Sequence, residues 1–335
     1  MPIGLFHRSR DCAILVNMTP KSRLTVFILG SLLSGCGFIH RPVELWPDDI
    51  DIEVDIPIFP PSSAWNTDIA GYPVHGNSAN LIGSIGNDTG LHADFGTVWN
   101  GAPNGIPFTV VNGGQAKMKI FFSYDEDSDP GPYPIPDNAP IEGGPYASGD
   151  RHVIVIDRDN HLLYELFAAY PHHAYWTAGS GAVWDLNGID RQRELGWTSA
   201  DAAGLPIFPG LVRYDEAASG EIKHALRFTV NDTRRAFIAP ASHYASNSDD
   251  VNLPPMGLRV RLKAAFDISS FSPMNQAILT AMKKYGMIVA DNGADWFVSG
   301  APDRRWDDDD LYELGSVQGS DFEAVDTGPI ELPPP

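Results

Sequence analysis

Glycine and proline are dense throughout this chain. Its 335 residues include 32 Gly and 28 Pro, about 18% of the total, whereas an average protein has about 12%. Glycine weakens helix interiors and proline interrupts them, so this density favours short strands joined by turns over a helical bundle. Hydrophobic residues make up 43% of the chain, which is enough for a globular core and excludes wholesale disorder.

Apolar runs and alternating patterns predict many short strands. Turn residues between neighbouring runs indicate three hairpins. The hairpins are expected to pair 106–111 with 117–122, 152–156 with 162–167, and 287–290 with 296–299. Alternation of apolar and polar side chains predicts two more half-buried strands, over 222–229 and 258–263.

Helices are expected at two places only. Ser272 can cap a helix that ends at Gly286, and a shorter helix is predicted over 198–203. Two long loops, 125–149 and 197–214, remain between the strands. The expected fold is therefore mainly β, an antiparallel β-sandwich or jelly-roll-like domain with a few helices and long loops.

The N-terminal segment has the features of an export signal. Lys21 and Arg23 precede an apolar run over 24–39, which is too short to span a ~30 Å hydrocarbon core comfortably. Within it, Leu33-Ser34-Gly35-Cys36 resembles the lipobox of bacterial lipoproteins. In that family the leader is cut before the cysteine, whose sulfur carries a diacylglycerol. The resemblance implies lipidation at Cys36; an ordinary buried helix or a single membrane anchor is the alternative.

The chain divides into four predicted segments. Residues 1–35 form a signal peptide, whose true start we place at Met18 because the longer leader contains an acidic residue. Residues 36–58 form a lipidated tether, 59–326 a single β-rich domain and 327–335 a flexible tail. The absence of aspartate after the lipobox cysteine implies the outer membrane if the host has one, and otherwise the outer face of the cell membrane.

The net charge limits the possible partners. The formal charge is −20, which repels nucleic-acid phosphates and anionic lipid headgroups. We therefore expect no nucleic-acid partner, and membrane attachment only through the lipid anchor.

Four stretches of the body are distinctive. They are GWTSADAAGLPIFPGLVRYDE from Gly196, GEIKHALRFTV from Gly220, KKYGMIVADNG from Lys283 and FPPSSAWNTDI from Phe59. Together they look like a family of uncharacterised secreted bacterial proteins. The resemblance implies a shared fold and export, and it assigns no catalytic residue.

Carboxylates are the first candidates for chemistry. Glycoside hydrolysis needs two of them, one to donate a proton and one to act as nucleophile or base. Glu165 is expected mid-strand among apolar neighbours, where burial raises a carboxyl pKa, and Asp201 lies in the loop after Trp197. Alternatively, Glu165 lies at an exposed edge or is a paired structural acid, and Asp201 is a helix-start acid that satisfies backbone donors.

Basic residues suggest a second chemistry. A polysaccharide lyase needs a cation to neutralise a uronate and a base to remove the adjacent proton. His224 and His243 are candidate bases and Arg227 a candidate cation, although alternation places Arg227 on the face opposite His224. The alternatives are a satisfied core histidine and loop packing.

Aromatic residues gather in the central loops. Trp176, Trp197 and Tyr214 are candidate substrate-binding residues, because sugar rings stack on aromatic faces. Packing in the core and loops is the alternative. Asp125, Asp127 and Asp129 resemble a calcium loop only in part, so we expect no cofactor, with calcium at this turn left open.

Two functions fit these features. The first is a surface-anchored lipoprotein that acts on carbohydrate, as a polysaccharide hydrolase or lyase. The second is a non-catalytic glycan-binding or envelope-structural lipoprotein.

Overall fold

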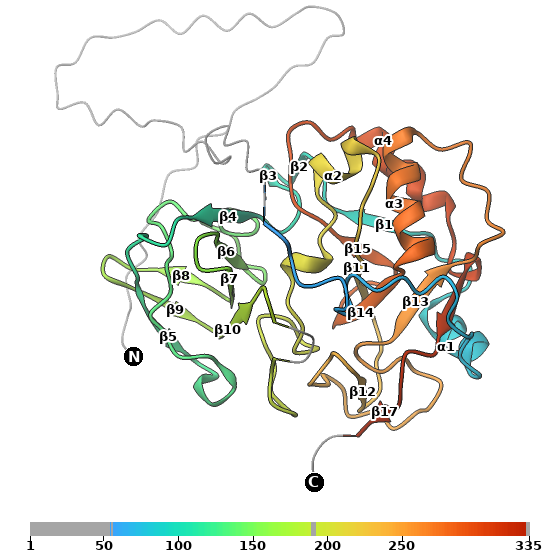
Figure 1. Cartoon of the computed structure of the whole chain (residues 1–335), viewed down its shortest axis with the longest axis horizontal. Helices are drawn as coiled ribbons and strands as arrows, with labels where there is room; N and C mark the ends of the chain where they lie inside the picture. Colours follow the sequence, from blue (N-terminus) through green and yellow to red (C-terminus); the bar gives the residue numbers. More distant parts are fainter. Residues whose placement is uncertain (1–53, 55, 189–191, 333–335) are drawn as a thin grey trace, which may run out of the picture. The chain divides into compact units, whose positions relative to one another are not determined.

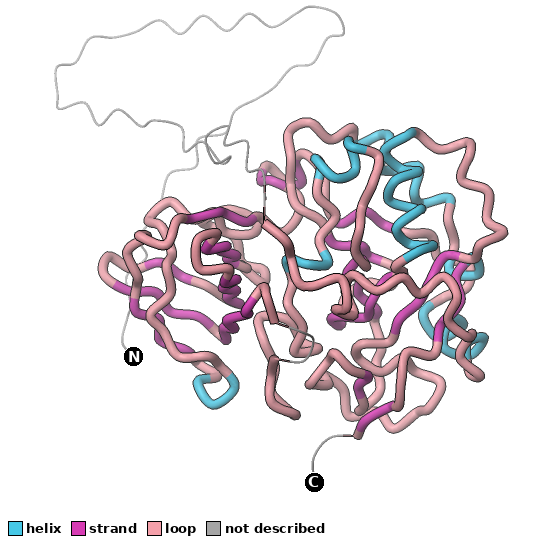
Figure 2. Tube along the Cα trace, in the orientation of Figure 1, coloured by secondary structure: helices cyan, strands magenta, loops and turns pink. Residues whose placement is uncertain are grey.

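A computed structural model describes residues 54, 56–188 and 192–332. The predicted signal peptide, its start at Met18 and the lipidation site at Cys36 lie outside these residues. Helices of the described ranges are all too short or too polar to cross a membrane. Within these ranges, strands are far more numerous than helices, and long loops connect them (Figure 2). The expected mainly β fold is therefore confirmed.

The main sheet has six strands in the order β1-β15-β11-β14-β13-β16 (Figure 1). It is mixed, because β11 runs parallel to β14 and antiparallel to β15, whereas β1 runs parallel to β15. Its strands are β1 (His92–Asp94), β11 (Leu226–Val230), β13 (Arg259–Leu262), β14 (Met287–Asn292), β15 (Phe297–Ser299) and β16 (Phe322–Val325).

Two smaller sheets stand beside it. One has the order β10-β7-β6-β4 and the other β5-β9-β8. Their strands are β4 (Phe108–Val111), β5 (Lys119–Phe122), β6 (Val153–Asp157), β7 (Leu162–Phe167), β8 (Tyr170–Pro171), β9 (Tyr175–Ala178) and β10 (Ser180–Asp185). Two short pairs complete the strands, β2 (Val98–Trp99) with β3 (Ala102–Pro103) and β12 (Phe237–Ile238) with β17 (Ile330–Glu331).

The predicted longer helix is confirmed as α3 (Pro273–Lys284), and the Ser272 hydroxyl accepts a hydrogen bond from Asn275 N–H at its start. The predicted helix over 198–203 is wrong. There the Ser199 hydroxyl accepts from the Asp201 N–H, a local turn that competes with helix formation. The other helical segments are α1 (Ser78–Ile85), α2 (Tyr214–Ser219), α4 (Asp308–Tyr312) and the 3-10 turns η1 (Asp125–Asp127), η2 (Phe208–Gly210), η3 (Glu313–Ser316) and η4 (Gly319–Asp321).

Only one of the three predicted hairpins forms. β6 and β7 pair antiparallel as expected. The other two are wrong, because β4 pairs in parallel with β6 and β5 pairs in parallel with β9, while β11 lies between β14 and β15. The strands exist near their predicted positions, but partners distant in sequence replace the neighbour across the turn. The strand predicted from residue 222 begins at Leu226.

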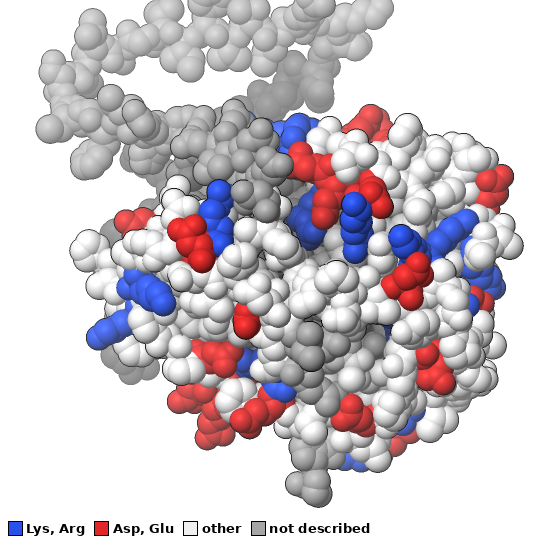
Figure 3. All heavy atoms as spheres, viewed as in Figure 1, with Lys and Arg blue, Asp and Glu red and all other residues white. Residues whose placement is uncertain are grey.

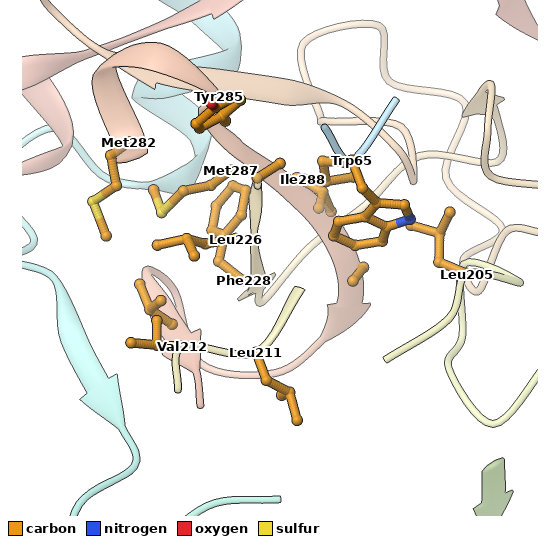
Figure 4. Packing of buried hydrophobic residues seen from close by; sticks show 14 of the residues in the cluster. Trp65, Leu205, Leu211, Val212, Leu226, Phe228, Met282, Tyr285, Met287 and Ile288 are labelled. Atoms are coloured by element: carbon orange, nitrogen blue, oxygen red, sulfur yellow. The ribbon is translucent and has the colours of Figure 1, made fainter. Parts of the chain in front are cut away.

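Alternate residues of the four-stranded sheet enter two different cores. Ile154 and Ile156 of β6 pack in the main core with the six-stranded sheet, part of which Figure 4 shows. Val153 and Val155 point the other way, into a second core shared with the three-stranded sheet. The period of two along a strand explains why all of β6 is buried. A four-stranded sheet covered on both faces gives the fold its sandwich-like layering.

The ends of the described chain depart from the predicted tether and tail. Val54, Ile56 and Ile58 pack against the main core, so this part of 36–58 is not a free tether. Ile330 pairs with Ile238 in the β12–β17 ladder, so the tail prediction is wrong for this strand. In both places, apolar side chains find a buried partner.

Candidate functional site

The site is built around Arg227, in the middle strand β11 of the main sheet. Its side chain is 4% exposed and its guanidinium donates to both carboxylate oxygens of Asp201, at 2.9 and 3.1 Å. It also donates to the Ser299 hydroxyl on β15 and, at 3.4 Å, to Asp291 at the end of β14. Arg227 therefore gathers residues from both flanking strands and from the loop that contains Asp201.

A register shift turns Asp291 toward Arg227. Phe228 pairs with Val289, but Thr229, the next residue, pairs with Asp291. The extra residue on β14 is a β-bulge, which reverses the face on which the following side chain emerges. Asp291 thus joins the face of Arg227 and Thr229, and its carboxylate accepts from the Asn292 N–H at 2.7 Å.

His152 and Glu142 form the second half of the site. The His152 Nδ1 lies 2.7 Å from a Glu142 oxygen, and its Nε2 lies 3.1 Å from the carbonyl oxygen of Ala200, next to Asp201. Because both ring nitrogens face acceptors, the ring is held as the imidazolium. Burial opposes this charge, but Glu142 outweighs burial and raises the pKa of His152 to about 9.

The carboxyls around Arg227 differ in proton affinity. Burial, reinforced by Asp201, raises the pKa of Asp291 to about 7, although Arg227 and His152 act in the opposite direction. Burial also raises the pKa of Asp94, on β1. At Glu142, burial is outweighed by His152, which lowers the pKa below its ordinary value of 4.5. At pH values below about 7, the site therefore contains a protonated carboxyl at Asp291 and an ionised carboxyl at Glu142.

Solvent reaches Asp291 and Glu142, the two carboxyls whose pKa values are shifted in opposite directions. The side chain of Asp291 is 24% exposed and that of Glu142 is 26% exposed. In contrast, the side chains of Asp201 and His152 are 0% and 3% exposed. Asp201 and His152 are therefore buried, whereas the Asp291 and Glu142 carboxyls are partly accessible to a reactant from solution.

The site residues named from sequence fall into separate places. Asp201 and Arg227 meet in this cluster. Burial raises the pKa of Glu165, and Asp201 adds to this effect. Glu165 itself is 0% exposed, and its carboxylate accepts from the N–H groups of Ile207 and Phe208 and from the Trp184 indole. It ties the 197–214 loop to β7, the paired structural role left open above.

The two histidines predicted from sequence as candidate bases, His224 and His243, lie outside the Arg227 site. The His224 Nε2 is 3.1 Å from Glu216 and 2.9 Å from an Arg213 nitrogen, in a cluster at α2. His243 stacks on Tyr244, and its Nδ1 lies 2.8 Å from the Ala202 carbonyl oxygen. The carboxyls of the Arg227 site are not hydrogen-bonding partners of either imidazole.

The three aromatic candidates do not form a platform. Trp176 is 3% exposed and points into the second core. The Arg193 guanidinium carbon lies 5.3 Å from the centroid of the Trp197 ring. Tyr214 packs edge-on against Trp306. Core and loop packing, the alternative stated for these residues, describes all three.

Acidic and histidine side chains of the described ranges form no group suited to a metal ion. At the turn that resembles a calcium loop, Arg193 bonds the Asp129 carboxylate and the Asp127 carbonyl oxygen. A side-chain cation of the protein thus lies where calcium was considered.

Sequence reasoning missed Asp94, Glu142, His152 and Asp291 as site residues. The sequence did contain a signal for part of this site, because three of the four distinctive stretches each contribute one residue to it, namely Asp201, Arg227 and Asp291.

No protein-family model, curated protein or solved structure matches this chain.

Glu165→Gln is expected to lower the free energy of unfolding by about 1–3 kcal/mol at pH 5, because the new amide turns a donor toward N–H groups. Burial raises the pKa of Glu165 from 4.5 to about 7, so its contribution is fully present below pH 4.5 and is lost as pH rises through 7. The deficit of the variant should therefore narrow from pH 5 to pH 8 in urea titrations. Glu221→Gln, at a side chain that is 59% exposed, is the control. A deficit that stays constant between pH 5 and pH 8 would show Glu165 ionised throughout.

Proposed function

We propose that this protein is a glycoside hydrolase that uses Asp291 as general acid and Glu142 as its carboxylate partner. The observation that carries the proposal is that two partly exposed carboxyls, Asp291 bonded to Arg227 and Glu142 bonded to His152, have pKa values moved in opposite directions. Environments that separate two carboxyl pKa values are how glycosidases assign acid and base roles.

The chemistry follows from these protonation states. Asp291 gives its proton to the glycosidic oxygen as the bond from that oxygen to the anomeric carbon breaks. The Glu142 carboxylate either attacks the anomeric carbon or removes a proton from the water that does so. Arg227 and His152 hold the two carboxyls in place and keep Glu142 ionised. They are positioning residues.

The same contacts favour a hydrolase over a lyase. A lyase needs a cation free to neutralise a uronate, but Arg227 already donates to Asp201, Ser299 and Asp291. It also needs an unprotonated base, whereas His152 is held as imidazolium between two acceptors.

We further propose that the enzyme is exported and anchored by a lipid on Cys36, at the outer membrane or the outer face of the cell membrane. The lipobox-like Leu33-Ser34-Gly35-Cys36 supports this location. Export would bring the site to extracellular or envelope polysaccharides. Membrane fractionation of Cys36→Ser tests the anchor, since retention of the variant in the membrane fraction would contradict it.

The decisive experiment uses the full-length protein purified from the membrane fraction in detergent. It is incubated with a panel of neutral and acidic plant, algal and bacterial polysaccharides. A hydrolase releases new reducing ends without ultraviolet absorbance of an unsaturated uronate, whereas a lyase produces both. New absorbance would overturn the hydrolase assignment. Binding without any cleavage across the panel would instead establish the non-catalytic glycan-binding alternative.

A further inference from the structure

The outward face of the three-stranded sheet β5-β9-β8 exposes several aromatic rings. Phe121 is 57% exposed, Tyr170 is 45% exposed and Tyr175 is 37% exposed. The opposite face of the same sheet is buried, since Trp176 and Ala178 of β9 belong to the second core. The sheet therefore has its apolar partner already, and the outward rings are a separate feature that needs its own explanation.

The outward side chains form two rows across the strands. Lys119 is the register partner of Tyr175, and the His172 N–H donates to the Tyr175 carbonyl. In the second row, Phe121 and Tyr170 lie on either side of Thr177. Neighbouring strands are about 4.8 Å apart, so each row presents a flat strip three side chains wide.

Contacts within the rows hold the rings in place. The Phe121 and Tyr175 rings meet edge to face with centroids 5.3 Å apart, and the His172 ring stacks on Tyr175 at 4.5 Å. The His172 Nε2 lies 3.1 Å from the Thr177 hydroxyl. The buried Arg151 guanidinium lies 4.2 Å from the centre of the Tyr170 ring. Rings fixed before binding lose little entropy when a ligand stacks on them.

The strands of this sheet contain a basic residue and no acidic one, unlike the chain as a whole. The residues of β5, β8 and β9 include no aspartate or glutamate, although the chain has a net charge of −20. Lys117 and Lys119 are exposed, and among the described residues neither forms an ion pair. Basic side chains are visible at the left edge of Figure 3, where Figure 1 places β8 and β9. Cations beside flat rings suit a ligand with both carboxylates and apolar sugar faces.

We propose that this face, defined by Lys119, Phe121, Tyr170, His172 and Tyr175, binds an extended anionic polysaccharide of the polyuronate class. Sugar C–H faces stack on the rings while Lys119 and His172 approach the carboxylates. The proposal rests on the proposed function for its biological use, because it names the substrate class that the sheet delivers to the Asp291 site. Binding at the sheet itself requires no cleavage.

The test measures binding of the full-length protein to polygalacturonate by affinity electrophoresis and calorimetry. Tyr175→Ala and Phe121→Ala are each expected to weaken binding about tenfold, as loss of a central aromatic contact does. Lys119→Gln should weaken it mainly at low salt. Tyr312→Ala, at a ring that is 83% exposed on α4, and Lys223→Gln, at a side chain that is 71% exposed, are matched controls and should bind normally. Tyr175→Phe should retain binding, which separates loss of the ring from misfolding.

Several results would overturn the proposal. They are unchanged binding in the alanine variants, equal binding of a neutral galactan, or binding of phosphatidylglycerol vesicles in place of polygalacturonate with the same dependence on these residues. Asp291→Asn should bind polygalacturonate normally. Its binding therefore distinguishes failure of the sheet proposal from failure of the hydrolase proposal.

Discussion

Asp291→Asn is expected to lower kcat for glycan hydrolysis by about 10²- to 10⁴-fold, the usual contribution of a positioned general acid. Asparagine keeps the shape and can still accept from the Asn292 N–H, but it has no proton to give to the leaving oxygen. The loss should appear in kcat more than in KM, because the proton is transferred in the transition state. Initial rates of reducing-end release measure it.

The pH dependence gives a second readout of the same assignment. Asp291 must be protonated and its pKa is about 7, so activity should fall as pH rises through 7. Glu142 must be ionised and its pKa lies below 4.5, so the acid limb should appear only below pH 4.5. A bell-shaped profile with these limbs is expected in the wild type, and the limb near pH 7 should be absent from any residual activity of Asp291→Asn.

Asp309→Asn is the matched control, because this aspartate is exposed on α4. It should change neither kcat nor the pH profile. Thermal unfolding of both variants separates lost chemistry from lost structure. Activity within a factor of about three of wild type in a folded Asp291→Asn would remove this residue from the general-acid role.

Local sequence patterns predicted the elements whose determinants are themselves local. The Ser272 cap and the apolar stripe behind it identify α3, and the Asp159-Asn160 turn identifies the β6–β7 hairpin. The turn at Asp291-Asn292-Gly293 is equally strong, but β14 pairs with β11 instead of the strand across the turn. That pairing depends on how β11 is buried between two strands distant from it in sequence, and a short stretch of sequence does not contain this information.

The dependence on contacts distant in sequence also explains why only part of the candidate site could be predicted. Asp201 and Arg227 were selected for their residue types, yet their meeting depends on a loop and a strand 26 positions apart. Asp291 follows directly after the predicted strand 287–290, where a turn is expected, and the β-bulge that redirects its side chain has no sequence signature. Alternation along β9 also explains the aromatic candidates, since Trp176 points inward and its neighbour Tyr175 points outward.

Arg227→Met is expected to lower the free energy of unfolding by about 3–5 kcal/mol. Methionine fills part of the space of the arginine stem but leaves the Asp201 carboxylate, 0% exposed, without its cation. Urea titration at pH 7 measures the loss. Arg235→Met is the control, because Arg235 pairs with Asp249 at the surface, with side chains 47% and 75% exposed. Its cost should not exceed about 1 kcal/mol.

A double variant separates the pair from its parts. Arg227→Met with Asp201→Leu removes the buried charge along with its partner, so most of the lost stability should return. Activity should not return, because Asp291 loses the guanidinium that positions it and that lowers its pKa. The falling limb of any residual activity should not move above pH 7, because the double variant also removes Asp201, whose charge raises the pKa of Asp291 more than Arg227 lowers it. If the single variant costs under about 1 kcal/mol, the buried contact between Arg227 and Asp201 does not stabilise the fold, and the positioning role of Arg227 at this site is contradicted.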